Sequence, residues 1–98
     1  MTQDDAKVIV EREMNKGLTP SQDGPLVVLD RHTKKKTYGW VFIVNTRRFS
    51  ETGDLADCAI GLGPVVFVIE DGSIHQLGSG RGANEEIAEF ERNLKGRY

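Results

Sequence analysis

The side chains in this sequence that could do chemistry are one cysteine and two histidines. Cys58 follows Asp57, and either His32 or His75 could supply a base, so the residue types of a thiol nucleophile are present. A nucleophilic cysteine also needs a helix N-terminus or a neighbouring base that lowers its pKa. Cys58 lies among small and apolar residues in an irregular segment. We therefore predict a packed cysteine and a protein that is not an enzyme.

The sequence also contains few residues that could bind a metal or a cofactor. One cysteine and two distant histidines do not form closely spaced ligand pairs. The segment Gly78-Ser79-Gly80-Arg81-Gly82 resembles a phosphate cradle, because bare amides in front of a helix attract anions. It lacks the GxGxxG spacing and the lysine of a P-loop, and Glu85 and Glu86 would repel phosphate. We expect neither a cofactor nor a metal.

Composition excludes several kinds of partner. The 98 residues fit one domain, 1–98, and a net charge of −2 provides no basic stripe for nucleic acid or for an anionic membrane. No apolar run approaches the roughly 20 residues of a membrane span. The acidic start, Met1 to Asp5, is unlike a signal peptide. A lone cysteine suits a reducing compartment, so we expect a cytoplasmic protein.

Two segments have helical periodicity. Thr2 and Asp5 form a capping-box pattern, and Gly17 provides a left-handed C-terminal cap, which together predict a helix over 3–16. A second helix begins at Asn84. Its apolar stripe consists of Ile87, Phe90 and Leu94.

Strands and turns occupy the middle of the chain. Turn residues fill 18–25, a lysine-rich hairpin connection spans 32–37, and an irregular crossing with one short helical turn spans 47–62. Asp71-Gly72 is a two-residue hairpin turn. Apolar, β-prone runs predict strands at 26–31, 38–46, 65–70 and 73–77.

This order predicts an α+β fold, a small two-layer domain in which the N-terminal and C-terminal helices pack on one face of a roughly four-stranded antiparallel sheet. Tyr38, Trp40 and Phe42 recur at period two. Facing the helices they would be core, whereas facing outward they would form an interface hot spot. Core is the commoner place for such residues. Val41 and Ile43 would then lie on the open face, where an apolar patch suggests a protein partner or a homodimer.

Residues 38–92 resemble the YrhB-like, immunity protein 35 family through an ordered set of short pieces. These are Gly39-Trp40-Val41-Phe42, Phe49-Ser50-Glu51-Thr52-Gly53-Asp54, Gly61-Leu62-Gly63-Pro64-Val65-Val66, Asp71-Gly72, Leu77-Gly78-Ser79 and the acidic helix from Glu85 to Phe90.

The resemblance implies a small cytosolic bacterial protein that neutralises a cognate polymorphic toxin by direct binding. A chaperone-like branch supplies the alternative, a holdase that captures unfolding proteins on its apolar sheet face. If the protein binds a toxin, we expect partner contacts from Val41 and Ile43. We also expect contacts from three acidic residues that would face a basic surface of the toxin, namely Glu51, Asp54 and Asp57. Structural roles are expected for Trp40, Phe42, Gly63, Pro64 and Gly72.

Overall fold

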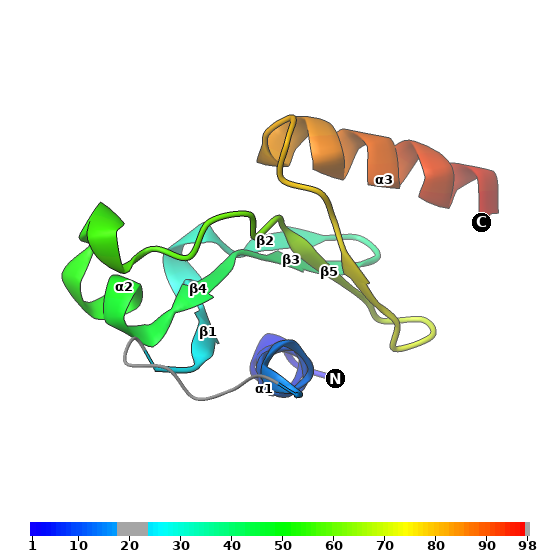
Figure 1. The fold of residues 1–98 in the computed structure, drawn as a ribbon. Coiled ribbons are helices and arrows are strands. Elements are labelled where there is room, and N and C mark those ends of the chain that lie inside the picture. The colour runs from blue at the N-terminus through cyan, green and yellow to red at the C-terminus, as the bar shows by residue number, and fades with distance from the viewer. Residues whose placement is uncertain (18–23, 98) are drawn as a thin grey trace.

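A four-stranded antiparallel sheet lies at the centre of the protein, which a computed structural model describes over residues 1–17 and 24–97 (Figure 1). The strands follow the order β2 (Lys34–Lys36), β3 (Gly39–Phe42), β5 (Val65–Val68) and β6 (Ile74–Gln76). A two-stranded antiparallel sheet pairs β1 (Leu26–Val28) with β4 (Val44–Thr46). The predicted α+β class and four-stranded antiparallel sheet are confirmed. The turn predicted over 18–25 falls largely outside the described residues.

The first helix, α1 (Gln3–Asn15), begins at the predicted capping box. The Asp5 amide donates to the Thr2 hydroxyl at 3.1 Å, and the Thr2 amide donates to the Asp5 carboxylate at the same distance. The hydrogen bonds from Thr2 lower the pKa of Asp5. Gly17 follows the helix with φ of +77°, the left-handed conformation that a glycine adopts without steric cost. Both predicted ends of this helix are confirmed.

Polar side chains of α1 take the place of a strand beside β1. The Leu26 amide donates to Asn15 Oδ1 at 2.7 Å, and Asn15 Nδ2 donates to the Leu26 carbonyl at 2.8 Å. One turn earlier, Glu11 Oε2 accepts a hydrogen bond from the Val28 amide at 2.8 Å. The edge of β1 that does not face β4 is therefore satisfied by side chains of the helix.

The strand predicted over 26–31 ends at Val28 and is followed by a short 3₁₀ helix, η1 (Asp30–His32), and two further predictions in this region are wrong. The run 38–46 is interrupted at Ile43, so that β3 joins the larger sheet while β4 pairs with β1. The segment 32–37, predicted as a connection, contains β2, whose three lysines pair with Gly39 to Val41. Backbone pairing with β3 outweighs the low strand propensity of lysine, and charged side chains are tolerated on an edge strand.

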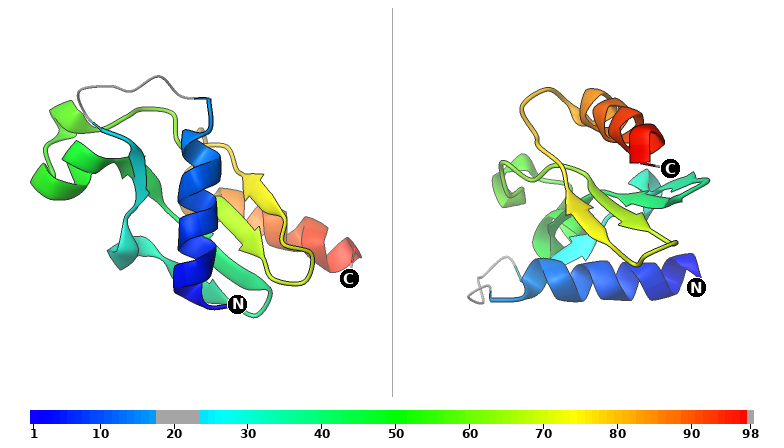
Figure 2. Two further views of the ribbon diagram at one scale, coloured as in Figure 1. Left: turned by 90° about the horizontal axis from the view of Figure 1, so that it is seen from below. Right: turned by 90° about the vertical axis from the view of Figure 1, so that its right-hand side faces the viewer.

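The two long helices cover opposite faces of the larger sheet (Figure 2). All eight residues of β3 and β5 are buried, so neither face of this strand pair can be left to water. Under α1, the core consists of Ala6, Val10, Val28, Trp40, Phe42, Val44, Val65 and Phe67. Under α3 (Ala83–Arg97), it consists of Val41, Val66, Val68 and Ile87. The prediction that both helices pack on one face is wrong, because successive strand residues point to opposite sides.

The predicted aromatic row is divided between the two faces. Trp40 and Phe42 are buried on the α1 side, at 5% and 1% exposure. Tyr38 precedes β3 in a turn and packs instead on Phe90 of α3, with ring centroids 5.9 Å apart. Val41 is completely buried, so its predicted position on an open face is wrong. That face is covered by the C-terminal helix.

Two glycines allow close approach of neighbouring strands. At Gly39, φ is +153° and a Cβ would overlap the carbonyl oxygen of Phe67. At Gly63, a Cβ would overlap the carbonyl oxygen of Leu77. The next residue along, the buried Pro64, accepts a hydrogen bond from the Leu77 amide at 2.8 Å. Any larger residue at these positions would force the strands apart.

The placement of α3 leads to a stability prediction. Ile87→Ala should lower the free energy of unfolding by about 2–5 kcal/mol, because this side chain of α3 is only 4% exposed and packs in the core against the sheet. Urea unfolding followed by circular dichroism measures this loss. The control is Val8→Ala on the exposed side of α1, which should change stability by less than about 0.5 kcal/mol. Equal effects of both changes would contradict the packing of α3 on the sheet.

Candidate protein-binding site

The residues of the hypothetical thiol nucleophile are not brought together. Cys58 Sγ lies 3.3 Å from Asn45 Nδ2, and the Asp57 carboxylate accepts a hydrogen bond from the Thr52 hydroxyl at 2.7 Å. His75 lies on β6, where its contacts are Ser73 and Phe90. None of the interactions among the described residues joins a histidine to this cysteine. The geometry therefore provides no base for the thiol.

A serine, a histidine and an aspartate do meet in the β5–β6 hairpin. The Ser73 hydroxyl lies 2.6 Å from Asp71 Oδ1 and 2.8 Å from His75 Nε2. The hydroxyl donates to the carboxylate, so in this arrangement its proton is not directed at His75. A hydrolase needs the histidine between the other two groups. Hydrogen bonds from Ser73 lower the pKa of Asp71, and the arrangement closes the turn.

The glycine-rich loop in front of α3 is occupied by carboxylates of the helix. Arg81 pairs with Glu86 at 3.0 Å and also with Glu89. Glu86 lies close against Gly78, where an added Cβ would approach its carboxylate oxygen to 3.2 Å. A phosphate at this helix end would meet negative charge. Within residues 1–17 and 24–97, no group of three metal-ligating side chains is close enough to hold an ion.

The crossing between β4 and β5 presents the most exposed apolar side chains among the described residues. Leu55 is 82% exposed and Ile60 is 97% exposed. Single exposed apolar residues are ordinary on protein surfaces. Here two such residues lie within one short segment. We call the set Glu51, Asp54, Leu55, Asp57 and Ile60 the crossing surface.

Side chains from the end of β4 hold the crossing in place. Asn45 Oδ1 accepts from the Ala59 amide at 2.8 Å, and Asn45 Nδ2 donates to the Ala59 carbonyl at 3.3 Å. The Thr46 hydroxyl donates to the Asp57 carbonyl at 2.7 Å. Both residues are buried, at 8% and 7% exposure. Their hydrogen bonds replace the backbone ladder that the crossing lacks.

Two short helices shape the crossing surface. The unpredicted α2 (Arg47–Thr52) begins where the Thr46 hydroxyl accepts from the Phe49 amide at 3.1 Å, and ends at Gly53 with φ of +70°. The predicted single turn is present as η2 (Leu55–Asp57), which Asp54 caps through the Ala56 amide. Threonine at position 46 and glycine at position 53 are the sequence signals that could have revealed α2.

The acidic residues expected to contact a partner lie in α2, at η2 and between them, and each has a local structural partner. Glu51 pairs with Arg47 at 3.5 Å, Asp54 caps η2, and Asp57 accepts from Thr52. Glu51 and Asp54 are exposed and Asp57 is half-buried, whereas Ile43 is half-buried in the gap between β3 and β4. Leu55 and Ile60 were not selected from the sequence, because hydrophobicity alone does not distinguish an exposed from a buried residue.

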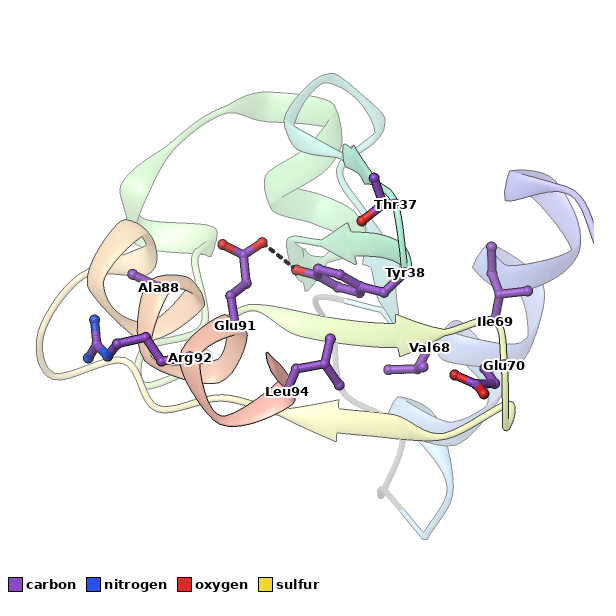
Figure 3. A pocket seen from close by; sticks show the side chains of 9 residues that line it. All are labelled: Thr37, Tyr38, Val68, Ile69, Glu70, Ala88, Glu91, Arg92 and Leu94. Atoms are coloured by element: carbon purple, nitrogen blue, oxygen red, sulfur yellow. Dashed lines mark hydrogen bonds between the residues drawn. The ribbon is translucent and has the colours of Figure 1, made fainter. Parts of the chain in front are cut away.

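A pocket of about 860 Å³ lies between α3 and the tips of the sheet (Figure 3). Tyr38 Oη donates to Glu91 Oε2 at 2.8 Å across it, and Lys36 Nζ lies 3.2 Å from the same oxygen. Burial, with the neighbouring carboxylate, raises the pKa of Tyr38. Apolar walls come from Val68 and Leu94. The central carboxylate is already engaged, and its contacts fasten α3 to the sheet.

Comparison with known proteins identifies the family. Residues 4–90 match the family described as immunity protein 35, so the chain belongs to the immunity protein 35 family. It is also 36% identical over 53 residues to the uncharacterized protein YrhB of Escherichia coli (strain K12). That match covers 54% of this chain and 56% of YrhB. No solved structure gives a significant match. No helix in the described ranges is long and apolar enough to cross a membrane.

The Asn45 contacts lead to a second stability prediction. Asn45→Ala should cost about 1–3 kcal/mol, because the Ala59 and Thr46 amides both lose their acceptor. Amide hydrogen exchange should accelerate most over residues 57–61. Ser50→Ala removes an exposed hydrogen bond within α2 and is the matched control. Faster exchange spread evenly over the whole protein would contradict a local clamp.

Tyr38 leads to a prediction for alkaline pH. Since its pKa is raised in the folded protein, the unfolded chain loses this proton first, near the ordinary value of 10.0. The stability contributed by Tyr38 is therefore present below pH 10 and is lost as the pH rises further. Urea midpoints of the wild type should fall more steeply across this range than those of Tyr38→Phe, which has no phenol proton. Parallel curves would contradict the assignment.

Proposed function

We propose that this protein is a non-catalytic immunity protein that neutralises a cognate protein toxin by binding and covering it. The observation that carries the proposal is the crossing surface, which combines two almost fully exposed apolar side chains with carboxylates on a rigidly held segment. Membership of the immunity protein 35 family supports it. Exposed apolar side chains supply binding energy on contact, and surrounding charges supply orientation and association rate.

The arrangement of the crossing favours a preformed surface. Asn45, Thr46 and the η2 cap fix the backbone on either side of Leu55 and Ile60. This segment then loses little conformational entropy when a partner buries these side chains. The protein would act as a single domain that blocks the toxin sterically. Its lone cysteine favours a cytoplasmic location.

The holdase alternative receives no support from the fold. It needs an apolar sheet face open to unfolding clients, and the four-stranded sheet carries α1 on one face and α3 on the other. The exposed large apolar side chains among the described residues lie outside the four strands of this sheet: Met1 and Val8 at α1, Leu55 and Ile60 in the crossing, and Ile69 after β5.

The proposal is tested by comparing matched surface variants. The double change Leu55→Asp and Ile60→Asp should weaken toxin binding by at least about 30-fold, since truncated hot-spot residues cost about 2 kcal/mol or more. The partner is first recovered from native cell extract and identified, and affinity is then measured with both purified proteins. The wild type should also protect cells that express the partner.

Val8→Asp, which also adds charge at an exposed apolar site, is the control and should bind normally. All variants should unfold at the wild-type urea midpoint, because the replaced side chains are exposed. A double variant that binds and protects like the wild type would overturn the crossing surface as the contact. A recovered partner that is not toxic, or is not inhibited, would overturn the immunity function itself.

A further inference from the structure

One edge of the central sheet has backbone groups available for another strand. β6 lies at the end of the strand order, opposite β2, and appears as the yellow arrow in Figure 2. The Ser73 carbonyl and the Leu77 amide both bond toward the β5 side, to Val68 and Pro64. In an antiparallel ladder this direction alternates, so the N–H and C=O groups of Ile74 and Gln76 point away from β5.

The other strand edges of the described residues are covered or charged. The outer side of β1 bonds to Glu11 and Asn15, and the end of β4 is bound to the crossing through its side chains. The β2 edge carries three consecutive lysines, a pattern that discourages pairing with another strand. In contrast, β6 has the sequence Ile74-His75-Gln76, which contains no lysine, arginine or carboxylate.

The charges next to β6 indicate which strand would pair with it. Glu70 and Asp71 precede the strand in the hairpin, and Arg81 follows it with three carboxylates of α3. The lysine, arginine and acidic residues within residues 70–89 are Glu70, Asp71, Arg81, Glu85, Glu86 and Glu89. Five carboxylates and one guanidinium therefore flank this edge. Such a field attracts a positively charged segment and raises its rate of association.

We propose that β6 is a docking edge for an extended, lysine- or arginine-bearing segment of another protein, which adds to the central sheet as a fifth strand. Main-chain hydrogen bonds to Ile74 and Gln76 would provide the pairing, and the flanking carboxylates would select a basic partner. This surface belongs to a different part of the fold from the crossing surface, and it does not depend on the toxin-binding role. A second copy of this chain is a poor occupant, because it would bring the same excess of carboxylates to the contact.

The test uses the intact ¹⁵N-labelled protein and a synthetic peptide, Lys-Val-Thr-Val-Thr-Val-Lys, blocked at both ends. Amide shift changes should concentrate at residues 73–78, increase with peptide concentration and weaken with added salt. A matched peptide with glutamate in place of both lysines should bind at least about tenfold more weakly. Gln76→Pro removes an outward N–H and should abolish the changes, whereas Gln76→Ala retains that N–H and should bind like the wild type.

The pair Glu70→Lys and Glu85→Lys gives an independent measurement, should the proline variant fail to fold. Both residues are exposed, and their reversal should weaken binding of the basic peptide by about tenfold while lowering the urea midpoint only slightly, because Glu85 lies in the first turn of α3. Absence of shifts at millimolar peptide, shifts centred on another element, or equal binding of the acidic peptide would each overturn the proposal. Concentration-dependent shifts at β6 in the protein alone would identify a second copy as the occupant and would also overturn it.

Discussion

The pairing of β3 with β5 is the interaction on which the rest of the structure depends. Both strands are apolar at every position and are buried throughout, so the pair has no face that water can solvate. A chain of this size satisfies that constraint by placing one amphipathic helix on each side. Residues of opposite parity, such as Trp40 and Val41, therefore reach different helices and form two separate cores. The C-terminal helix covers the face that would otherwise expose apolar side chains to water.

Outside this strand pair, side chains make many of the hydrogen bonds to the backbone that a neighbouring strand would usually make. Glu11 and Asn15 satisfy the free edge of β1, while Asn45 and Thr46 fasten a long crossing to the end of β4. Such contacts are geometrically demanding, because a buried amide left without its acceptor is costly. They fix a segment of little regular structure without burying its outward side chains. Exposed apolar and acidic side chains can then remain available on an otherwise well-packed domain.

The family and the geometry together favour recognition of a protein partner. Immunity protein 35 membership covers most of the chain, and the residue types of a thiol or serine catalyst occur in arrangements that do not provide a base. The crossing surface and the β6 edge differ in chemistry, since the first offers apolar side chains and the second offers main-chain hydrogen bonds. Both proposals place carboxylates beside the contact, so each expects a partner with a basic surface.

Local signals in the sequence determined the elements whose causes are local. The capping box at Thr2, the glycine after α1 and the apolar runs of β3 and β5 act over a few residues, and these elements were predicted correctly in type and order. Tertiary structure decided what depends on distant partners. The lysines of β2 became a strand because β3 offered a ladder, the run at Ile43 was divided between two sheets, and Val41 was buried because α3 crossed to the second face. The exposure of Leu55 and Ile60 was decided in the same way, since burial follows from which element packs above a residue and not from its hydrophobicity.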